Sequence, residues 1–465
     1  MALRFYNTMT RRKEDFQPIN NGQVRMYTCG PTVYDFAHIG NLRTFMFEDL
    51  LRRYLKYKGY QVTQVMNLTD IDDKTIKGSK AQGISLDEYT DRYKKAFFED
   101  VDTLNMERAD EYPEATKHID LMVEIVSDLL KKGYAYEMGG SIYYKISQFP
   151  EYGKLSHMKL EDLKAGARIA TDEYEKEQVS DFALWKGWDE NDGDVFWETE
   201  LGKGRPGWHI ECSAMSMHYL GQTFDIHTGG EDNIFPHHEN EIAQSEAHTG
   251  KPFANYWMHA LHLIVEGKKM SKSLGNYFTL RDMLAKGYAP MAIRYLLLST
   301  HYRMQLNFTL DGLNAAKAGV ERYQNCFDLL AEVNNDTDGG EVNDYITTAE
   351  KKFENALDDD LNISEALGVV FDYIRDVNRL KAENKLSKAE AEKALETLYH
   401  FDTVLGLNKR AEATLDSEVE ALITARIQAR KDKNWAEADR IRDKLDEMGI
   451  ILEDTPSGTK WKKKL

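Results

Sequence analysis

The chain has 465 residues, and its 60 Lys and Arg against 78 Asp and Glu give a formal net charge of −18. Hydrophobic residues make up 42% of the sequence, enough for packed cores, which excludes global disorder. Three cysteines exclude a disulfide-stabilised scaffold and favour a reducing compartment. No apolar run approaches the roughly 20 residues that span a bilayer, and no secretory signal is visible. We therefore expect a cytoplasmic protein of about three domains with no membrane partner.

The first predicted elements form a βαβ unit. Val24–Thr28 and Gln61–Leu68 have the pattern of strands, and Phe47–Leu55 carries apolar residues at helical spacing. This order implies a parallel sheet with a right-handed crossover, whose ligands bind beyond the carboxyl ends of the strands. We expect Phe224–His227 and Leu261–Val265 to continue the same sheet. The fold class is therefore predicted to be α/β.

Two later regions differ from this domain. Residues 113–203 begin with a helix and continue with Tyr- and Lys-rich stretches, which indicates an insertion into the parallel-sheet domain. Beyond residue 279 the pattern is helical, because Thr279 and Asp282 have the spacing of a helix cap and Gly287 would stop that helix. A compact tail follows a linker near residues 408–415.

Two motifs have the chemistry needed to bind ATP. His38-Ile39-Gly40-Asn41 lies between the first strand and its helix, where His38 supplies a donor and the helix N-terminus favours phosphate groups. Lys269-Met270-Ser271-Lys272-Ser273 follows the predicted strand Leu261–Val265 and offers cations that would stabilise charge on a leaving pyrophosphate. Taken singly, each is more often a surface histidine or a solvated loop. Their order on a βαβ frame resembles class I aminoacyl-tRNA synthetases.

A third set of residues indicates a metal site. Cys29 follows the first strand, Cys212 lies far downstream, and His237 and Glu241 share one face of a helix if Pro236 begins that helix. Two thiolates, one imidazole and one carboxylate form a credible zinc shell. The spacing fits no zinc finger, so buried structural cysteines remain the alternative.

Four segments resemble the cysteinyl-tRNA synthetase family: Cys29–Tyr34, Asn67–Lys74, Gly207–Met215 and Phe235–Gln244. The similarity covers essentially the whole chain. It implies that L-cysteine is activated by ATP to cysteinyl-adenylate and transferred to the 3′ end of tRNA(Cys), with release of AMP and pyrophosphate. It also implies a monomer that uses ATP with Mg²⁺.

The resemblance assigns residues to this reaction. One zinc ion per chain would be held by Cys29, Cys212, His237 and Glu241, bind the substrate thiolate and discriminate against serine, although the residues alone leave His238 as an alternative to His237. Catalysis is assigned to His38, Asn41, Lys269 and Lys272, and ATP binding to His38, Gly40, Asn41 and Lys272. Cysteine would be bound by Gly30, Thr69, Trp208 and Asp232. The family's first motif often ends in a second His, and here that position is Asn41, whose amide can still donate a hydrogen bond.

The tail resembles the anticodon-reading module of that family. The matching positions are Arg430, Trp435, Asp439 and Asp454. Cations suit phosphates, aromatic rings stack on unpaired bases, and carboxylates accept hydrogen bonds from base edges. Without the resemblance, an amphipathic hairpin with a solvated face would be the simpler interpretation.

The resemblance also suggests domain boundaries. We expect a Rossmann-type catalytic domain (1–112 and 204–245), an inserted connective domain (113–203), a stem-contact region with the Lys-Met-Ser-Lys-Ser loop (246–315), a helical bundle (316–405) and a small anticodon-binding domain (406–465). One rival hypothesis is a paralogous ligase that joins cysteine to a sugar amine, which should lack the tail Ser417–Leu465. Another is a catalytically silent RNA-binding protein, against which the intact motifs speak.

Overall fold

The computed structural model describes residues 2–158, 181–335, 342–408, 419, 422–430, 434–447, 450–455 and 458–463. The chain divides into two units, residues 1–407 and 408–465, each with its own packing. Within the described residues, no helix is both long and apolar enough to cross a membrane.

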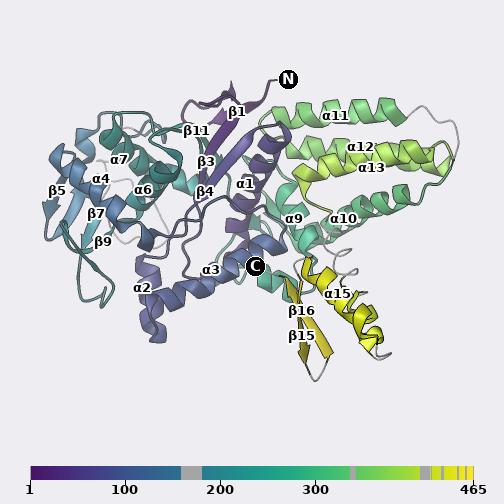
Figure 1. Cartoon of the computed structure of the whole chain (residues 1–465). Helices are drawn as coiled ribbons and strands as arrows, with labels where there is room; N and C mark the ends of the chain where they lie inside the picture. The colour runs from purple at the N-terminus through teal and green to yellow at the C-terminus, as the bar shows by residue number, and fades with distance from the viewer. Residues whose placement is uncertain are drawn as a thin grey trace. The chain divides into compact units, whose positions relative to one another are not determined.

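A four-stranded parallel sheet lies at the centre of the first unit, in the order β11-β10-β3-β4 (Figure 1). Its strands are β3 (Gln23–Thr28), β4 (Gln61–Met66), β10 (Phe224–Gly230) and β11 (Ala254–Ala260). Three of the expected strands are therefore confirmed, but Leu261–Val265 is not the fourth. That role belongs to β11, and only the two-residue β12 (Ile264–Val265) falls in the expected segment.

The segment Leu261–Val265 does not form the expected strand of the parallel sheet, for a physical reason. Leu263 and Val265 are buried, but they pack into the core from a connection that has already left the sheet. β11 itself is buried on both sides, so its sequence does not alternate between apolar and polar residues. A short antiparallel pairing of β12 with β13 (Lys268–Lys269) and a parallel one with β14 (Asn307–Phe308) complete this region.

Helices cover both faces of the sheet. The crossover helix α1 (Ile39–Tyr57) belongs to one large apolar core, and α4 (Ile119–Lys131), α6 (Trp208–Leu220) and α7 (Glu239–Thr249) contribute to the other. The helices α2 (Asp73–Gln82) and α3 (Leu86–Thr103) follow β4. A short hairpin of β1 (Arg4–Asn7) and β2 (Arg12–Asp15) lies beside β11, where Thr8 N–H donates to Trp257 O at 2.8 Å.

The inserted region forms an antiparallel sheet of its own in the order β5-β6-β7-β9-β8. Its strands are β5 (Ala135–Met138), β6 (Ser141–Tyr144), β7 (Phe182–Gly187), β8 (Trp197–Thr199) and β9 (Gly202–Pro206), with single turns η1 (Ala115–Lys117) and η2 (Ile146–Gln148) beside them. β9 runs directly into α6, so the insertion leads straight back to the carboxyl edge of the central sheet.

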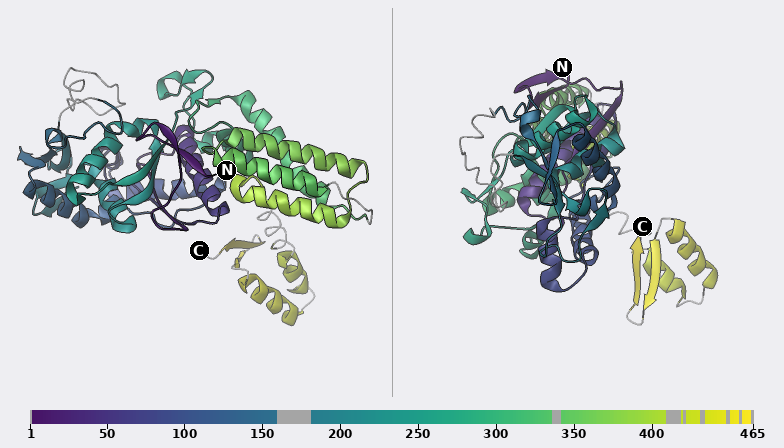
Figure 2. Two further views of the ribbon diagram at one scale, coloured as in Figure 1. Left: turned by 90° about the horizontal axis from the view of Figure 1, so that it is seen from above. Right: turned by 90° about the vertical axis from the view of Figure 1, so that its left-hand side faces the viewer.

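The second half of this unit is helical. After the turn η5 (Lys272–Leu274), the helices are α8 (Leu280–Ala285), α9 (Pro290–Leu298), α10 (Leu310–Ala331), α11 (Val342–Asp358), α12 (Ile363–Ala382) and α13 (Lys388–Leu405). The last three lie side by side as a bundle (Figures 1 and 2). The predicted cap is present, because Thr279 and Asp282 form a reciprocal capping box at the start of α8.

The second unit has a small core of its own. Residues 422–430 are helical, and α15 (Trp435–Glu447) precedes a hairpin of β15 (Ile450–Thr455) and β16 (Gly458–Lys463). Its buried apolar residues are Val419, Ile423, Ile441, Leu445 and Ile450.

Candidate active site

The predicted site residues gather beyond the carboxyl ends of the parallel strands. Cys29 and Gly30 follow β3, Asn67 and Thr69 follow β4, and the turns η3 (Glu231–Asn233) and η4 (Ile234–His238) follow β10. A parallel sheet brings these ends to one edge, which explains why segments distant in sequence meet there.

Cys29, Cys212, His237 and Glu241 offer ligand atoms that all lie within 4.8 Å of one another. His237 Nε2 lies 3.5 Å from Cys212 Sγ and 3.1 Å from Glu241 Oε1. The separation of four residues places His237 above Glu241 on the continuous turn from η4 into α7. A second set replaces Cys212 and His237 with His227 and His238 and shares Cys29 and Glu241.

The cluster suits a cation. Burial raises the pKa of the Cys29 thiol and of the Glu241 carboxyl, and burial lowers the pKa of His237 well below its usual value. The imidazoles are therefore neutral, as metal ligands must be. Among the described residues, no donor makes a well-directed hydrogen bond to Glu241 Oε1, although His237 Nε2 is near. A positive ion bound between Glu241 Oε1 and His237 Nε2 would stabilise the lone pairs of these two atoms.

The distances distinguish the two histidines. Tetrahedral zinc at ordinary bond lengths separates a sulfur from a nitrogen ligand by about 3.5 Å. His237 Nε2 lies 3.5 Å from Cys212 Sγ, whereas His238 Nε2 lies 3.2 Å from Cys29 Sγ and 3.9 Å from Glu241 Oε1. Both histidines have a partner at Nδ1, His209 for His237 and His259 for His238, each at 2.8 Å, so this contact does not separate them. The geometry favours the set that contains His237.

Three further histidines surround the cluster: His209, which the family resemblance also places beside the pocket, and His227 and His259, which the sequence did not indicate. His209 Nδ1 lies 2.8 Å from His237 Nδ1, His227 Nε2 lies 2.9 Å from Glu241 Oε2, and His259 contacts His238. All three are buried. His209 meets His237, and His259 meets His238, at the Nδ1 atom that is turned away from the metal position. His227 meets the second carboxylate oxygen of Glu241. Outer-sphere residues of metal sites make contacts of this kind.

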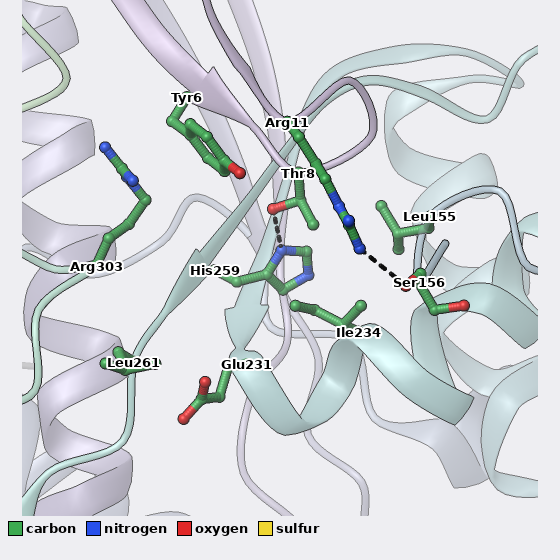
Figure 3. Close-up of a pocket in the computed structure, with 10 residues that line it drawn as sticks. All are labelled: Tyr6, Thr8, Arg11, Leu155, Ser156, Glu231, Ile234, His259, Leu261 and Arg303. Carbon is green, nitrogen blue, oxygen red and sulfur yellow. Dashed lines mark hydrogen bonds between the residues drawn. The ribbon is translucent and has the colours of Figure 1, made fainter. Parts of the chain in front are cut away.

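A hollow of about 260 Å³ lies next to this histidine network (Figure 3). His259 forms part of its wall and pairs through Nδ1 with Thr8 Oγ1 at 2.8 Å, and Arg11 donates to Ser156 O at 3.3 Å. None of the residues predicted to bind ATP or cysteine lines it. The hollow is therefore adjacent to the candidate site and does not coincide with it.

The predicted cysteine-binding residues fall into two groups. Trp208 stacks on His237 with ring centroids 3.9 Å apart, Gly30 follows Cys29 and donates its N–H to Asn67 Oδ1 at 2.9 Å, and Thr69 Oγ1 lies 3.1 Å from Glu211 Oε2, next to Cys212. A Cβ at Gly30 would lie 1.8 Å from Asn67 O, so only glycine fits. Asp232 differs, because 65% of its side chain is exposed and its Oδ1 lies 3.7 Å from His262 Nε2.

The first ATP motif caps α1. His38 Nδ1 accepts from Asn41 N–H at 3.1 Å, and Asn41 Oδ1 accepts from His38 N–H at 3.2 Å. Because Nδ1 is an acceptor, the neutral ring carries its proton on Nε2. A Cβ at Gly40 would lie 2.9 Å from the His38 ring and 3.3 Å from Met270 Cε, so this glycine allows the second motif to approach.

The second ATP motif meets the first through both backbone and side chains. Ile39 N–H donates to Phe278 O at 2.9 Å, just beyond the Lys-Met-Ser-Lys-Ser loop. Lys272 Nζ lies 2.9 Å from Asp35 Oδ2 and 5.0 Å from the centre of the Tyr277 ring, which also packs edge-on against His38. Lys269 is exposed on β13.

The predicted anticodon residues lie in the second unit. Trp435 is 60% exposed at the start of α15. Arg430 is exposed, and Asp439 lies 3.3 Å from Arg442 on the same helix. Asp454 belongs to β15, opposite Thr459, and its side chain is outside the described part of the structure.

Comparisons with known proteins show which sequences and folds this chain is similar to. Residues 15–318 match the family model of the class I (C) tRNA synthetase catalytic domain, 352–409 match the DALR domain, and 412–461 match the cysteinyl-tRNA ligase anticodon binding domain. The cysteine--tRNA ligase of Protochlamydia amoebophila is 53% identical over 100% of this chain and 98% of that protein. That of Brachyspira hyodysenteriae is 50% identical over 99% of each. The fold is similar to that of Mycobacterium tuberculosis methionyl-tRNA synthetase in complex with methionyl-adenylate (TM-score 0.60, 14% identity, 83% of this chain and 90% of that chain).

Proposed function

This chain belongs to the cysteine--tRNA ligase family, and we propose that it selects its amino acid with a zinc ion held by Cys29, Cys212, His237 and Glu241. The observation that carries the proposal is the convergence of these four side chains within 4.8 Å at the carboxyl edge of the sheet. When bound, zinc supplies a soft Lewis acid that accepts a thiolate in preference to a hydroxyl oxygen.

Selection by bonding chemistry matters because cysteine and serine differ only at one atom. A pocket that recognises shape alone rejects a near-isostere by roughly 100-fold. Trp208 lies against His237 and would cover the bound side chain, while Gly30 and Thr69 border the same space. The pocket would then need no separate editing site to reject serine.

The two ATP motifs would position and stabilise phosphates in the first step. The carboxylate of cysteine attacks the α-phosphorus of ATP, and pyrophosphate leaves. The Nε2–H of His38, the amide of Asn41 and the N-terminus of α1 would bind the triphosphate near Gly40, and Lys269 and Lys272 would offset the charge that develops on the leaving group. A bound Mg²⁺ would supply further positive charge there.

In the second step a terminal ribose hydroxyl of tRNA(Cys) attacks the adenylate carbonyl, and AMP leaves. We assign recognition of the anticodon to Arg430, Trp435, Asp439 and Asp454, in the part of the chain that matches the anticodon binding domain. We assign residues 113–203 to a connective domain, residues 246–315 to a stem-contact region and residues 316–405 to a helical bundle. We further propose a monomer that acts in the cytoplasm.

The two rival hypotheses make different predictions. A ligase acting on a sugar amine would not need the tail, whose match to an anticodon binding domain favours tRNA as the acceptor. A silent RNA-binding protein would not need a neutral His38 that caps α1 through Nδ1 next to a loop whose Lys272 pairs with Asp35.

The test is charging of unfractionated tRNA with labelled cysteine and, in parallel, labelled serine. We expect charging with cysteine only, and loss of that charging on removal of zinc by a chelator. His237→Ala should also lose bound zinc, measured by elemental analysis, while His238→Ala should retain it. If His238→Ala lost the metal and His237→Ala kept it, the assigned ligand set would be wrong. Pyrophosphate exchange without charging would point to a small amine acceptor.

A further inference from the structure

The acidic segment between β4 and α2 contacts both ends of the inserted region. It includes Asp70 and Asp73 and lies at the carboxyl edge of the central sheet. The inserted region begins with η1 and returns to the sheet through β9, which ends at Pro206, just before α6. Asp70 contacts the first of these ends and Asp73 contacts the second.

Asp70 holds the end at which the chain enters the inserted region. Its carboxyl group accepts from Thr116 N–H at 2.9 Å and from the Thr116 hydroxyl at 2.7 Å. Asp70 is buried, and Lys94 Nζ on α3 lies 3.3 Å from Asp70 Oδ2 and 2.7 Å from Glu114 Oε2. The entry to the insertion is therefore fixed to the residues that follow β4.

Asp73, the first residue of α2, holds the end at which the chain leaves the inserted region. Arg205 on β9 is buried and donates through Nη2 to Asp73 Oδ1, and Lys186 Nζ on β7 lies 3.2 Å from Asp73 Oδ2. Burial opposes ionisation of Asp73, but the two cations keep its pKa below the usual value. Arg205 also donates through Nε to Asp192 Oδ1 at 2.8 Å. One guanidinium thus joins α2 to the antiparallel sheet.

The connection from Arg205 to the candidate site is short and has little freedom. A Cβ at Gly207 would lie 2.0 Å from Ala183 O, so the backbone after β9 packs directly against β7. Trp208 comes next, begins α6 and stacks on His237 with ring centroids 3.9 Å apart. A displacement of Arg205 would therefore also displace the indole of Trp208.

We infer that Asp73 is a positioning residue for the proposed cysteine pocket, because through Arg205 it holds Trp208 in place over that pocket. Asp70 fixes the other end of the insertion to the same segment. This inference rests on the proposed function, which assigns the space beside Trp208 to cysteine. The ATP motifs lie on other elements, at the start of α1 and beside η5, so we expect an effect on cysteine that ATP does not share.

The test is the KM for cysteine and the KM for ATP in pyrophosphate exchange, measured on Asp73→Asn. We expect the KM for cysteine to rise by about 10-fold, as on loss of a hydrogen bond between charged groups, while the KM for ATP and the zinc content change by less than about twofold. Asp73→Glu keeps the charge and should restore most of the affinity for cysteine. Because 52% of the Asp73 side chain is exposed, Asp73→Asn should fold, and thermal unfolding of the same samples checks this.

Two further variants separate positioning from stability of the insertion. Asp192→Asn is the matched control, because Asp192 accepts from the same guanidinium but lies within the insertion, between β7 and β8. It should lower the unfolding temperature without changing the KM for cysteine. Arg205→Ala should raise the KM for cysteine as Asp73→Asn does, and adding Asp73→Asn to it should have little further effect, because Asp73 acts through Arg205.

Three results would overturn the inference. An unchanged KM for cysteine in Asp73→Asn and in Arg205→Ala would mean that their pair does not set the pocket. Equal rises in the KM values for cysteine and ATP, or an equal rise for cysteine in Asp192→Asn, would mean that these residues only keep the insertion folded. Additive effects of the Asp73 and Arg205 substitutions would mean that Asp73 does not act through Arg205. Failure of the unmodified enzyme to exchange pyrophosphate with cysteine would instead refute the proposed function.

Discussion

His38 has one role in the structure and a second in the proposed function, and a pair of substitutions separates them. Its Nδ1 caps α1 by accepting from Asn41 N–H, and we propose that its Nε2–H contacts ATP. His38→Ala removes both roles. His38→Asn keeps a residue that is among the best helix caps but replaces the imidazole donor with a shorter side chain.

The magnitudes follow from these contacts. Loss of an N-cap costs about 1 kcal/mol of stability, so His38→Ala should unfold at a lower temperature while His38→Asn stays close to the unmodified enzyme. Loss of one donor to a charge that develops in the transition state lowers the rate by about 10²- to 10³-fold. Both variants should show that loss in the rate of pyrophosphate exchange.

The assay is ATP–pyrophosphate exchange at saturating cysteine, with thermal unfolding of the same samples as the structural control. The decisive variant is His38→Asn. If it were as stable as the unmodified enzyme and exchanged pyrophosphate at a rate within fivefold of it, His38 would be only a helix cap, and the proposed ATP contact would be refuted.

Three further outcomes are expected. Gly30→Ala should abolish cysteine activation, because its Cβ would lie 1.8 Å from Asn67 O; retention of normal exchange activity would show that the strand end can move. Lys272→Ala should reduce the exchange rate at least 100-fold, whereas Asp35→Ala should change it by less than fivefold, since their pair is largely solvated; equal losses would contradict this. Burial and the charge of His262 lower the pKa of His38 to about 4, so unfolding will take up a proton here and stability should fall as pH drops from about 6.5 to 4. Thermal unfolding against pH should show a smaller fall in His38→Asn, and an identical fall in both proteins would refute the assignment.

The sequence predicted the parts of the fold that have local signals. β3, α1 and β4 follow from hydrophobic periodicity, and the cap of α8 from the pair Thr279 and Asp282. β11 was missed because a strand buried on both faces has no alternation to detect, and Asn255 and His259 make it look like a loop. The antiparallel sheet of the insertion was also missed, since its strands are short and β6 pairs with β7 although residues 145–181 lie between them.

The candidate site also contains residues that the sequence could identify and residues that it could not. The ligands Cys29 and Cys212 could be proposed because cysteines are rare in this chain and have recognisable chemistry. His227 and His259 could not, because their importance depends on burial and on which atoms they meet. A buried histidine next to a candidate ligand has no signature in sequence other than its position.

Residues far from the proposed ATP site should affect it, because α1 connects them to that site. Its N-terminus presents His38, and its third turn carries Asp49, which accepts from the fully buried Arg294 at 2.6 Å. Arg294 also donates to Leu405 O at 2.8 Å, at the last residue of α13. All three nitrogens of this buried guanidinium donate hydrogen bonds, and breaking such a buried pair costs about 3–5 kcal/mol. The helix that carries the proposed ATP contact is thus anchored to the end of the helical bundle, so the orientation of His38 depends on packing as well as on its own cap.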